Sequence, residues 1–185
     1  RSLCCGLYVL LTPYDCLYVH DHMLPWGRLR DLPNQSIRAN LVVVTKCPKN
    51  MLPIDRRVVA NELQLPSYQQ LVFSHIAYKQ LSLPGTPLLV TGIANPKPML
   101  AYLREQYPNT ELLSFPDHHM FTNQDIKNIL SRAKDYACVV TTEKDYMRLR
   151  QTSLVEQLDS KLYIQSIQTD FGIDKEVFDR AILLY

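Results

Sequence analysis

The stretch ELLSFPDHHMFTNQDI, residues 111–126, has the order of a buried strand, a polar turn and a helix. Its apolar run, residues 111–115, has the length of a strand, and Thr122-x-x-Asp125 resembles a helix-capping box with Asp in the place of Glu. A strand followed directly by a helix is the building unit of an α/β sheet. Apolar side chains then continue at helical spacing at Ile126, Ile129, Leu130 and Ala133.

The same alternation extends to both sides of this stretch. Apolar runs at residues 88–91, 138–142 and 162–167 predict three further strands, and Asn95 and Pro96 predict the N-cap and first position of a helix. Strands that alternate with helices of about 10–15 residues favour a parallel, right-handed arrangement. We therefore expect a three-layer α/β/α, Rossmann-like fold with a mainly parallel sheet.

The first half of the chain contains two more predicted strands. Residues 7–12 and 41–46 are apolar runs of the kind that is covered on both faces of a sheet. The proline-punctuated residues 14–40 between them form a long loop, and long loops in compact domains are usually functional. Residues 71–78 have an extended pattern. Pro53 predicts the start of a helix, with one face formed by Ile54, Val58 and Leu63.

These elements suggest a division of the chain into three parts. We expect residues 1–46 to be the end of one domain and residues 87–185 to be a C-terminal α/β domain. Residues 47–86 between them are expected to be a linker region with a helix and an extended β segment. The chain opens on Arg1 directly before a strand, which indicates a protein that begins within a domain.

Composition narrows the class of protein. Twenty basic and eighteen acidic side chains give a formal net charge of +2, which offers no global argument for nucleic acid as a partner. No run approaches the roughly 18 apolar residues of a spanning helix, and no signal-peptide pattern opens the chain. The cysteines lack C-x-x-C or zinc-ligand spacing, so we expect reduced core residues of a cytoplasmic protein at Cys4, Cys5, Cys16, Cys47 and Cys138.

Polar residues follow three of the predicted strands, at residues 92–96, 117–119 and 142–145. The carboxyl ends of parallel strands meet at one edge of a sheet, where open α/β folds hold their ligands. An imidazole there, from His118 or His119, can act as a general base or relay, because it changes charge near neutral pH. Asp117 can orient one of these rings. The alternatives are a solvated turn and a metal site, although the tripeptide lacks further metal ligands.

Residues 142–145 allow two interpretations. Thr142, Glu143 and Asp145 suit the N-terminus of a helix, where acidic and hydroxyl side chains favour the helix dipole. Lys144 at the same point would suit an anionic ligand.

The loop of residues 14–40 contains an Arg-x-Arg sequence. Arg28 and Arg30 can clamp a phosphate through bidentate hydrogen bonds, or they can be ordinary solvated side chains. Arg38 can assist them or lie at the surface. Neither G-x-x-x-x-G-K-[ST] nor G-x-G-x-x-G occurs, so we do not expect the chain alone to bind a nucleoside triphosphate in the usual manner.

Five motifs, taken in order, resemble the tetraacyldisaccharide 4'-kinase family of lipid A biosynthesis, in the variant of Bacteroidetes-type bacteria. The resemblance covers nearly the whole chain but only about the C-terminal half of the family. The motifs are LPWGRLRD (24–31), VVTK (43–46), GIANP (92–96), FPDHH (115–119) and TEKD (142–145).

The resemblance implies a peripheral enzyme at the cytoplasmic face of the bacterial inner membrane. With ATP and Mg²⁺, it would phosphorylate the 4'-hydroxyl of tetraacyldisaccharide 1-phosphate to give lipid IVA. Residues 1–46 would then be the remainder of a P-loop-type kinase domain, and residues 87–185 the smaller α/β domain. The P-loop, its lysine and the Mg²⁺ ligands are not present here, so the isolated chain is expected to be inactive.

The resemblance also implies roles for single residues. His118 matches a catalytic histidine that pairs with an aspartate, which would lie just before Arg1. Arg28, Arg30 and Asp31 fall in a motif that binds the phosphorylated disaccharide, although Asp31 stands where Glu is usual and Trp26 where Ala is usual. For the supporting positions no firm role is carried over; these are Asp117, His119, Glu143, Lys144 and Asp145.

Two rival hypotheses remain at this point. The chain can be a non-catalytic α/β module that binds an anionic sugar or nucleotide. It can also be a metal hydrolase that uses Asp117, His118 and His119.

Overall fold

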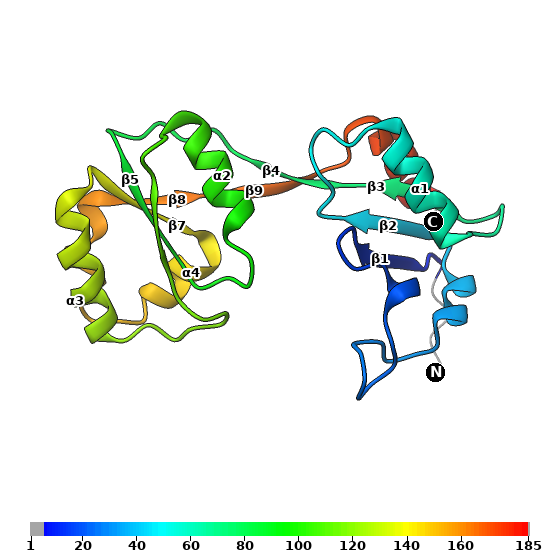
Figure 1. Cartoon of the computed structure of the whole chain (residues 1–185), viewed down its shortest axis with the longest axis horizontal. Coiled ribbons are helices and arrows are strands. Elements are labelled where there is room, and N and C mark those ends of the chain that lie inside the picture. The colour runs from blue at the N-terminus through cyan, green and yellow to red at the C-terminus, as the bar shows by residue number, and fades with distance from the viewer. Residues whose placement is uncertain (1–5, 185) are drawn as a thin grey trace. The chain divides into compact units, whose positions relative to one another are not determined.

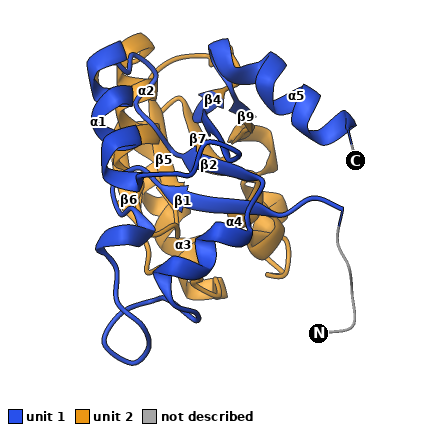
Figure 2. Ribbon diagram, turned by 90° about the vertical axis from the view of Figure 1, so that its right-hand side faces the viewer, with its two compact units in different colours: residues 1–77, 169–185 blue, residues 78–168 orange. Residues whose placement is uncertain are grey.

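The structure is a computed structural model that describes residues 6–184 (Figure 1). The chain forms two compact units, which Figure 2 distinguishes by colour. Unit 1 comprises residues 1–77 and 169–185, and unit 2 comprises residues 78–168. Within the described residues, no helix combines the length and the apolar character that a membrane-spanning segment requires.

Unit 2 is built on a four-stranded parallel sheet in the order β6-β5-β7-β8. Its strands are β5 (Pro87–Thr91), β6 (Glu111–Ser114), β7 (Cys138–Thr142) and β8 (Leu162–Gln165). All four lie where the apolar runs predicted them. The predicted parallel α/β arrangement is therefore confirmed.

Helices cover both faces of this sheet. They are α2 (Lys97–Gln106), α3 (Asn123–Arg132) and α4 (Glu143–Leu149). Leu88 of β5 packs with Ile126 of α3, whereas the next residue, Leu89, packs with Leu103 of α2. Successive strand residues point to opposite faces, so these two core clusters are the two sides of a three-layer fold. Each such fully buried aliphatic side chain stabilises the fold by about 1.5–3 kcal/mol.

The start of α2 differs from the prediction by one residue. Asn95 was the predicted N-cap and Pro96 the first helical residue, but the helix begins at Lys97 with Pro96 as its cap. Asn95 Oδ1 accepts a hydrogen bond from the backbone N–H of Lys97 at 3.3 Å, so it serves the first turn from one position further out.

Unit 1 contains a second parallel sheet, in the order β1-β2-β3. Its strands are β1 (Val9–Pro13), β2 (Leu41–Thr45) and β3 (Gln70–Phe73), with α1 (Pro53–Leu63) and α5 (Lys175–Leu183) as its helices. One face of β2 packs on α1 and the other on α5. The predicted loop between β1 and β2 contains two 3-10 helices, Tyr18–His20 and Pro33–Arg38.

The predicted apolar face of α1 was only partly right. Leu63 is buried, but it shares its face with Val59, while Ile54 and Val58 are exposed. At 3.6 residues per turn, Ile54 lies on the opposite side of the helix from Leu63.

The chain passes between the units through β4 (His75–Tyr78) and β9 (Ile167–Asp170), which pair as a two-stranded sheet. The division differs from the expected one in two places. Residues 47–77 are part of unit 1 and not a separate linker, and the C-terminal residues from 169 belong to unit 1 and not to the domain of residues 87–185. Asp174 explains this return. Its buried carboxylate is 2.6 Å from Arg56 of α1 and accepts the backbone N–H of Phe73 at 2.8 Å.

Candidate functional site at the strand ends of unit 2

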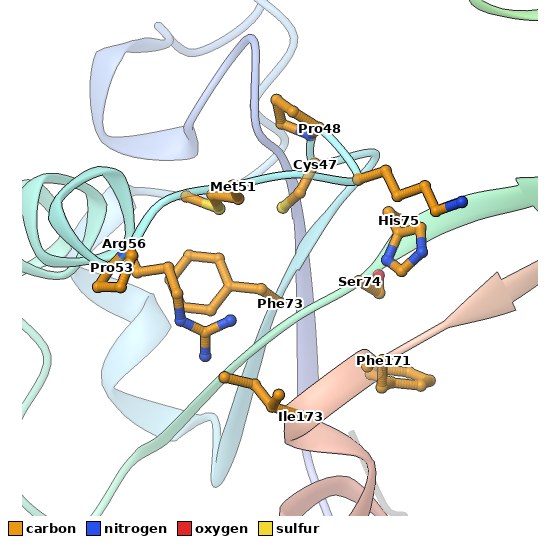
Figure 3. Close-up of a pocket in the computed structure, with 12 residues that line it drawn as sticks. Cys47, Pro48, Met51, Pro53, Arg56, Phe73, Ser74, His75, Phe171 and Ile173 are labelled. Carbon is orange, nitrogen blue, oxygen red and sulfur yellow. The ribbon is translucent and has the colours of Figure 1, made fainter.

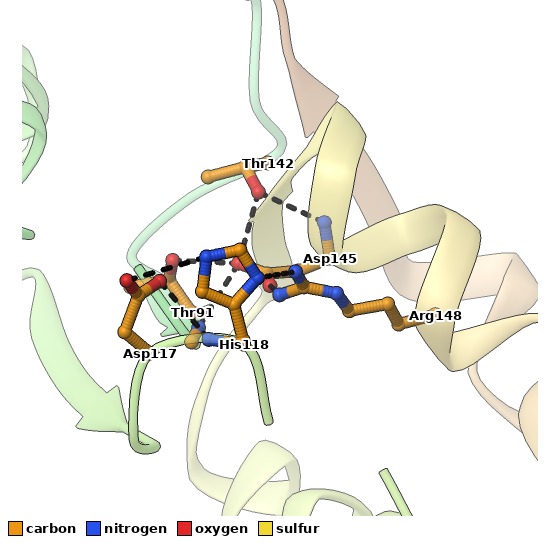
Figure 4. Close-up of polar contacts among 7 residues, drawn as sticks. Thr91, Asp117, His118, Thr142, Asp145 and Arg148 are labelled. Carbon is orange, nitrogen blue, oxygen red and sulfur yellow. Dashed lines mark hydrogen bonds and ion pairs between the residues drawn. The ribbon is translucent and has the colours of Figure 1, made fainter. Parts of the chain in front are cut away.

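The three polar strand ends of unit 2 lie together at one edge of its sheet (Figure 4). Gly92, which follows β5, lies close to the turn that follows β6 and to Asp145 of α4. A Cβ atom at Gly92 would lie 3.1 Å from the carbonyl oxygen of Pro116 and 3.5 Å from Oδ1 of Asp145. An added Cβ would therefore press on the turn after β6, whereas its distance to Asp145 is an ordinary van der Waals contact. The predicted convergence of these strand ends is present.

Asp145 is the centre of the polar network at this edge. Its side chain is fully buried, and Oδ2 accepts hydrogen bonds from Thr91 Oγ1 at 2.7 Å, Gly92 N at 2.9 Å and Thr142 Oγ1 at 2.9 Å. Its other oxygen, Oδ1, accepts from Nη1 of Arg148 at 3.2 Å. A buried carboxylate is tolerated when it is paired and hydrogen-bonded in this way. Asp145 therefore joins β5, β7 and α4, and it holds the Arg148 guanidinium in place.

His118 lies at the end of this network. Its backbone has φ 60°, a left-handed conformation, and its N–H donates to Asp117 Oδ1 at 3.0 Å. The ring is 70% exposed, and its Nδ1 lies 3.1 Å from Nη2 of Arg148. A guanidinium group donates hydrogen bonds and accepts none. The contact therefore makes Nδ1 the acceptor, and the neutral ring carries its proton on Nε2.

Asp117 contributes mainly by accepting the backbone N–H of His118 with its side-chain oxygen. Its Oδ2 is 3.6 Å from Nε2 of His118, which is longer than a normal hydrogen bond. The Nε2–H of His118 therefore makes no hydrogen bond of normal length to Asp117 and can serve a further acceptor.

His119 belongs to a different local structure. Its Nε2 is 3.0 Å from Oδ2 of Asp125, and its ring stacks on Phe115 with a centroid distance of 4.9 Å. The half-buried ring thus fastens β6 to the start of α3, which is a structural position. Within residues 6–184, no three His, Cys, Asp or Glu side chains are grouped so that they could hold a metal ion. The metal-hydrolase hypothesis consequently has no ligand set here.

The capping box at the start of α3 is confirmed. Thr122 Oγ1 accepts from Asp125 N at 3.2 Å, and Asp125 Oδ2 accepts from Thr122 N at 2.8 Å. Burial acts against the charged carboxylate, but these bonds and the His119 ring hold the pKa of Asp125 below its ordinary value of 3.8. The lowered pKa means that the folded state favours the ionised form.

We therefore expect Asp125 to stabilise the fold near neutral pH and to lose that contribution as the pH falls below about 4. Asp125→Asn should lower stability near neutral pH by about 1 kcal/mol and should flatten the acid limb of the stability profile. Urea denaturation at a series of pH values measures both effects. Asp135→Asn, at an exposed site in the same unit, is the control, and an unchanged acid limb in Asp125→Asn would contradict the assignment.

The two interpretations of residues 142–145 separate in the structure. Thr142 caps α4, with its Oγ1 accepting from Asp145 N at 3.0 Å, so the helix N-terminus is confirmed. Asp145 points inward, whereas Glu143 and Lys144 are exposed on the first turn. A role for Lys144 toward an anion stays a prediction.

The other predicted residues, Arg28, Arg30 and Asp31, lie in unit 1. Nε of Arg28 donates to Oδ2 of Asp21 at 3.1 Å, and Asp31 Oδ2 accepts from Arg38 Nη2 at 2.8 Å. Arg28 and Asp31 are therefore already engaged in ion pairs. Arg30, Asp31 and Arg38 line a cavity of about 420 Å³ in unit 1. Its remaining walls are largely apolar, formed among others by Tyr8, Leu10, Leu29 and Leu32. Such a lining suits a ligand that is both apolar and anionic.

A smaller cavity of about 220 Å³ lies beyond the ends of β2 and β3 (Figure 3). Cys47, Phe73 and Arg56 line it, and the Arg56 guanidinium lies 4.3 Å from the centroid of the Phe73 ring. Burial raises the pKa of the Cys47 thiol, so Cys47 is no thiolate nucleophile at neutral pH. Sequence reasoning did not single out this cavity, although both strands end there.

Sequence reasoning also missed Thr91 and Arg148. Thr91 ends β5 as Thr142 ends β7, and that shared position is a usable signal. Arg148 follows Asp145 by three residues in α4, the spacing of side chains on one helix face.

The family model and the curated relatives that match this chain carry the same kinase description. Residues 7–184 match the family model described as tetraacyldisaccharide-1-P 4'-kinase. Two relatives, each named tetraacyldisaccharide 4'-kinase, come from Flavobacterium johnsoniae (40% identical, 100% of this chain, 56% of the relative) and Bacteroides thetaiotaomicron (38% identical, 97% and 55%). The chain thus spans about half the length of the curated relatives it matches. The comparison with solved structures gave no match. The chain belongs to the tetraacyldisaccharide 1-phosphate 4'-kinase family.

Proposed function

We propose that this chain is part of an enzyme that transfers the γ-phosphate of ATP to the 4'-hydroxyl of tetraacyldisaccharide 1-phosphate, giving lipid IVA. We further propose that the enzyme acts as a peripheral protein at the cytoplasmic face of the bacterial inner membrane. Family membership over residues 7–184 supports the reaction class. The observation that carries the assignment to particular atoms is the contact of 3.1 Å between Arg148 and Nδ1 of His118.

His118 is suited to orienting a carboxylate base. With Nδ1 occupied by Arg148, the proton of the neutral ring is on Nε2. The Nε2–H group can then donate a hydrogen bond to an aspartate, and that aspartate is the base that takes the proton of the sugar hydroxyl. His118 then orients the base and does not itself accept the proton. Phosphoryl transfer depends on positioning and on charge stabilisation, so fixing one ring nitrogen is a direct contribution.

Among residues 6–184, no three His, Cys, Asp or Glu side chains are grouped as metal ligands, and the sequence contains no P-loop motif. We assign the binding of ATP and Mg²⁺ to the part of the family's length that this chain does not span. Residues 1–46 are proposed to be the remainder of that P-loop-type domain. Because α1 and β3 belong to the same unit, we place the connection in β4, after which the unit that contains His118 begins.

For the lipid substrate we propose the cavity lined by Arg30. The guanidinium groups of Arg30 and Arg38 can bind the phosphate of the disaccharide, and the apolar walls can accept acyl carbon. Arg28 and Asp31 contribute by fixing the shape of the loop through their pairs with Asp21 and Arg38.

The direct test is a chimaera in which this chain replaces the matching portion of the Flavobacterium johnsoniae relative. We expect the chimaera to phosphorylate tetraacyldisaccharide 1-phosphate at the 4' position with ATP, and the 185-residue chain alone to show no turnover. The product is measured by thin-layer chromatography with labelled ATP. The relative itself is the positive control.

A chimaera that folds as judged by circular dichroism but transfers no phosphate would overturn the proposal. If such a chimaera still bound the disaccharide 1-phosphate, the rival assignment as a non-catalytic binding module would take its place.

A further inference from the structure

The only tryptophan of the sequence, Trp26, is 89% exposed. Its neighbours Met23 and Leu24 are exposed as well. Large apolar side chains that gather at one point of a surface usually mark a contact with another molecule. The segment between β1 and β2 that carries them extends away from the sheet of unit 1 (Figure 2).

The turn that presents Trp26 is closed by its own hydrogen bonds. Trp26 N and Gly27 N donate to the carbonyl oxygen of Met23 at 3.0 and 3.1 Å, and Leu24 N donates to Leu29 O at 2.9 Å. A Cβ atom at Gly27 would lie 2.2 Å from the carbonyl oxygen of His22, so only glycine fits there. The apolar side chains are therefore displayed by a defined structure, not by a loose loop.

In this turn the Arg28 side chain is exposed, whereas its partner carboxylate, Asp21, is largely covered. Asp21 is 15% exposed, and it accepts from the backbone N–H groups of His22 and Arg28 and from Nε of Arg28. The backbone N–H groups, first that of His22, hold the pKa of Asp21 below its ordinary value, so it is a carboxylate at neutral pH. The Arg28 side chain is 70% exposed. An approaching surface thus meets a guanidinium group and apolar side chains, while the carboxylate is turned away from it.

We propose that the turn of residues 22–29 docks on the surface of a phospholipid bilayer. Trp26 and Leu24 enter the interfacial region, and Arg28 lies at the level of the lipid phosphates. Tryptophan and arginine are the side chains that favour this depth, because each has an apolar body and a polar end. A bilayer is favoured over a protein partner because the proposed substrate is itself a membrane lipid, and on this point the inference rests on the proposed function.

The single tryptophan of the sequence can report membrane contact by its fluorescence. With vesicles of phosphatidylethanolamine and phosphatidylglycerol, we expect the Trp26 emission to shift to shorter wavelength. Brominated phospholipid should quench it, and acrylamide should quench it less than in solution. In vesicle sedimentation, Trp26→Ser should weaken binding about tenfold or more, and Trp26→Phe should retain most of it. Leu183→Ser, at a site that is 84% exposed on α5, should bind as the unaltered chain does.

Sedimentation that does not change in Trp26→Ser, or a vesicle-independent emission, would overturn the inference. An emission shift that follows protein concentration in the absence of vesicles would assign the turn to contact between copies of the chain instead. The measurements need no catalysis, so the docking can hold even if the chimaera proves inactive. If both hold, Trp26→Ser in the chimaera should slow turnover of vesicle-embedded substrate and leave turnover of detergent-dispersed substrate unchanged.

Discussion

His118→Ala in the chimaera should lower kcat by about 10²–10⁴-fold, the range for general-base catalysis, because the proposed aspartate base loses the group that orients it. Arg148 donates a hydrogen bond to Nδ1 of the ring, and the ring can offer Nε2–H to the proposed aspartate base. Alanine removes that donor and leaves the turn intact, since the backbone N–H of residue 118 still donates to Asp117. KM for the lipid should change little, because the side chain serves the transfer step. Steady-state kinetics at saturating ATP measures the effect.

His20→Ala is the matched control. His20 is another exposed imidazole with a polar partner, its Nε2 lying 3.0 Å from Oε2 of Glu62, but it lies in unit 1 on a 3-10 helix. Its replacement should leave kcat unchanged. Turnover of His118→Ala at the rate of the unaltered chimaera would remove His118 from the mechanism. A loss in His118→Ala that Arg148→Met reproduces in part would support the positioning role of Arg148.

Asp145→Ala should lower the free energy of unfolding of unit 2 by about 3–5 kcal/mol, the cost of breaking a buried ion pair. The substitution leaves the hydroxyl of Thr91, the N–H of Gly92 and the guanidinium of Arg148 without their shared acceptor. Urea denaturation followed by far-UV circular dichroism measures the change. Tryptophan fluorescence is unsuitable for this purpose, because Trp26 belongs to unit 1.

Asp179→Ala is the comparison for this variant. Asp179 is also paired, 2.7 Å from Lys175, but at an exposed position of α5, and exposed pairs contribute about 0–1 kcal/mol. A loss of less than about 1 kcal/mol in Asp145→Ala would show that water can take the place of the carboxylate as an acceptor for its partners. The network would then not be a structural centre.

The fold class was predictable because the sheet of β1–β3 and the sheet of β5–β8 are parallel and their central strands are covered on both faces. Such strands are continuous apolar runs, as in residues 41–45 and 138–142, and their carboxyl ends must meet at one edge. Local capping chemistry at Thr122 and Asp125 was predictable for a different reason, because its hydrogen bonds join residues close in sequence.

Features that depend on distant residues were not predictable. Asp174 pairs with Arg56, 118 positions away, and no local pattern announces that the C-terminal segment returns to unit 1. The position of the proton on a neutral His118 ring depends on Arg148, which is 30 positions away, and the backbone of His118 is left-handed at this turn. The engagement of Arg28 by Asp21 likewise depends on the tight turn at Gly27. A sequence shows which groups can bond, but a fold selects which of them do.

The paired strands β4 and β9 have a consequence for biosynthesis. Unit 2 is one uninterrupted length of chain, whereas unit 1 needs residues from both sides of it, including α5. The ribosome releases a polypeptide from its N-terminus, so all residues of unit 2 are synthesised before the last residues of unit 1. Until α5 emerges, the face of β2 that carries Leu41 and Val43 lacks its cover, so the nascent chain exposes an aggregation-prone surface that chaperones would need to shield.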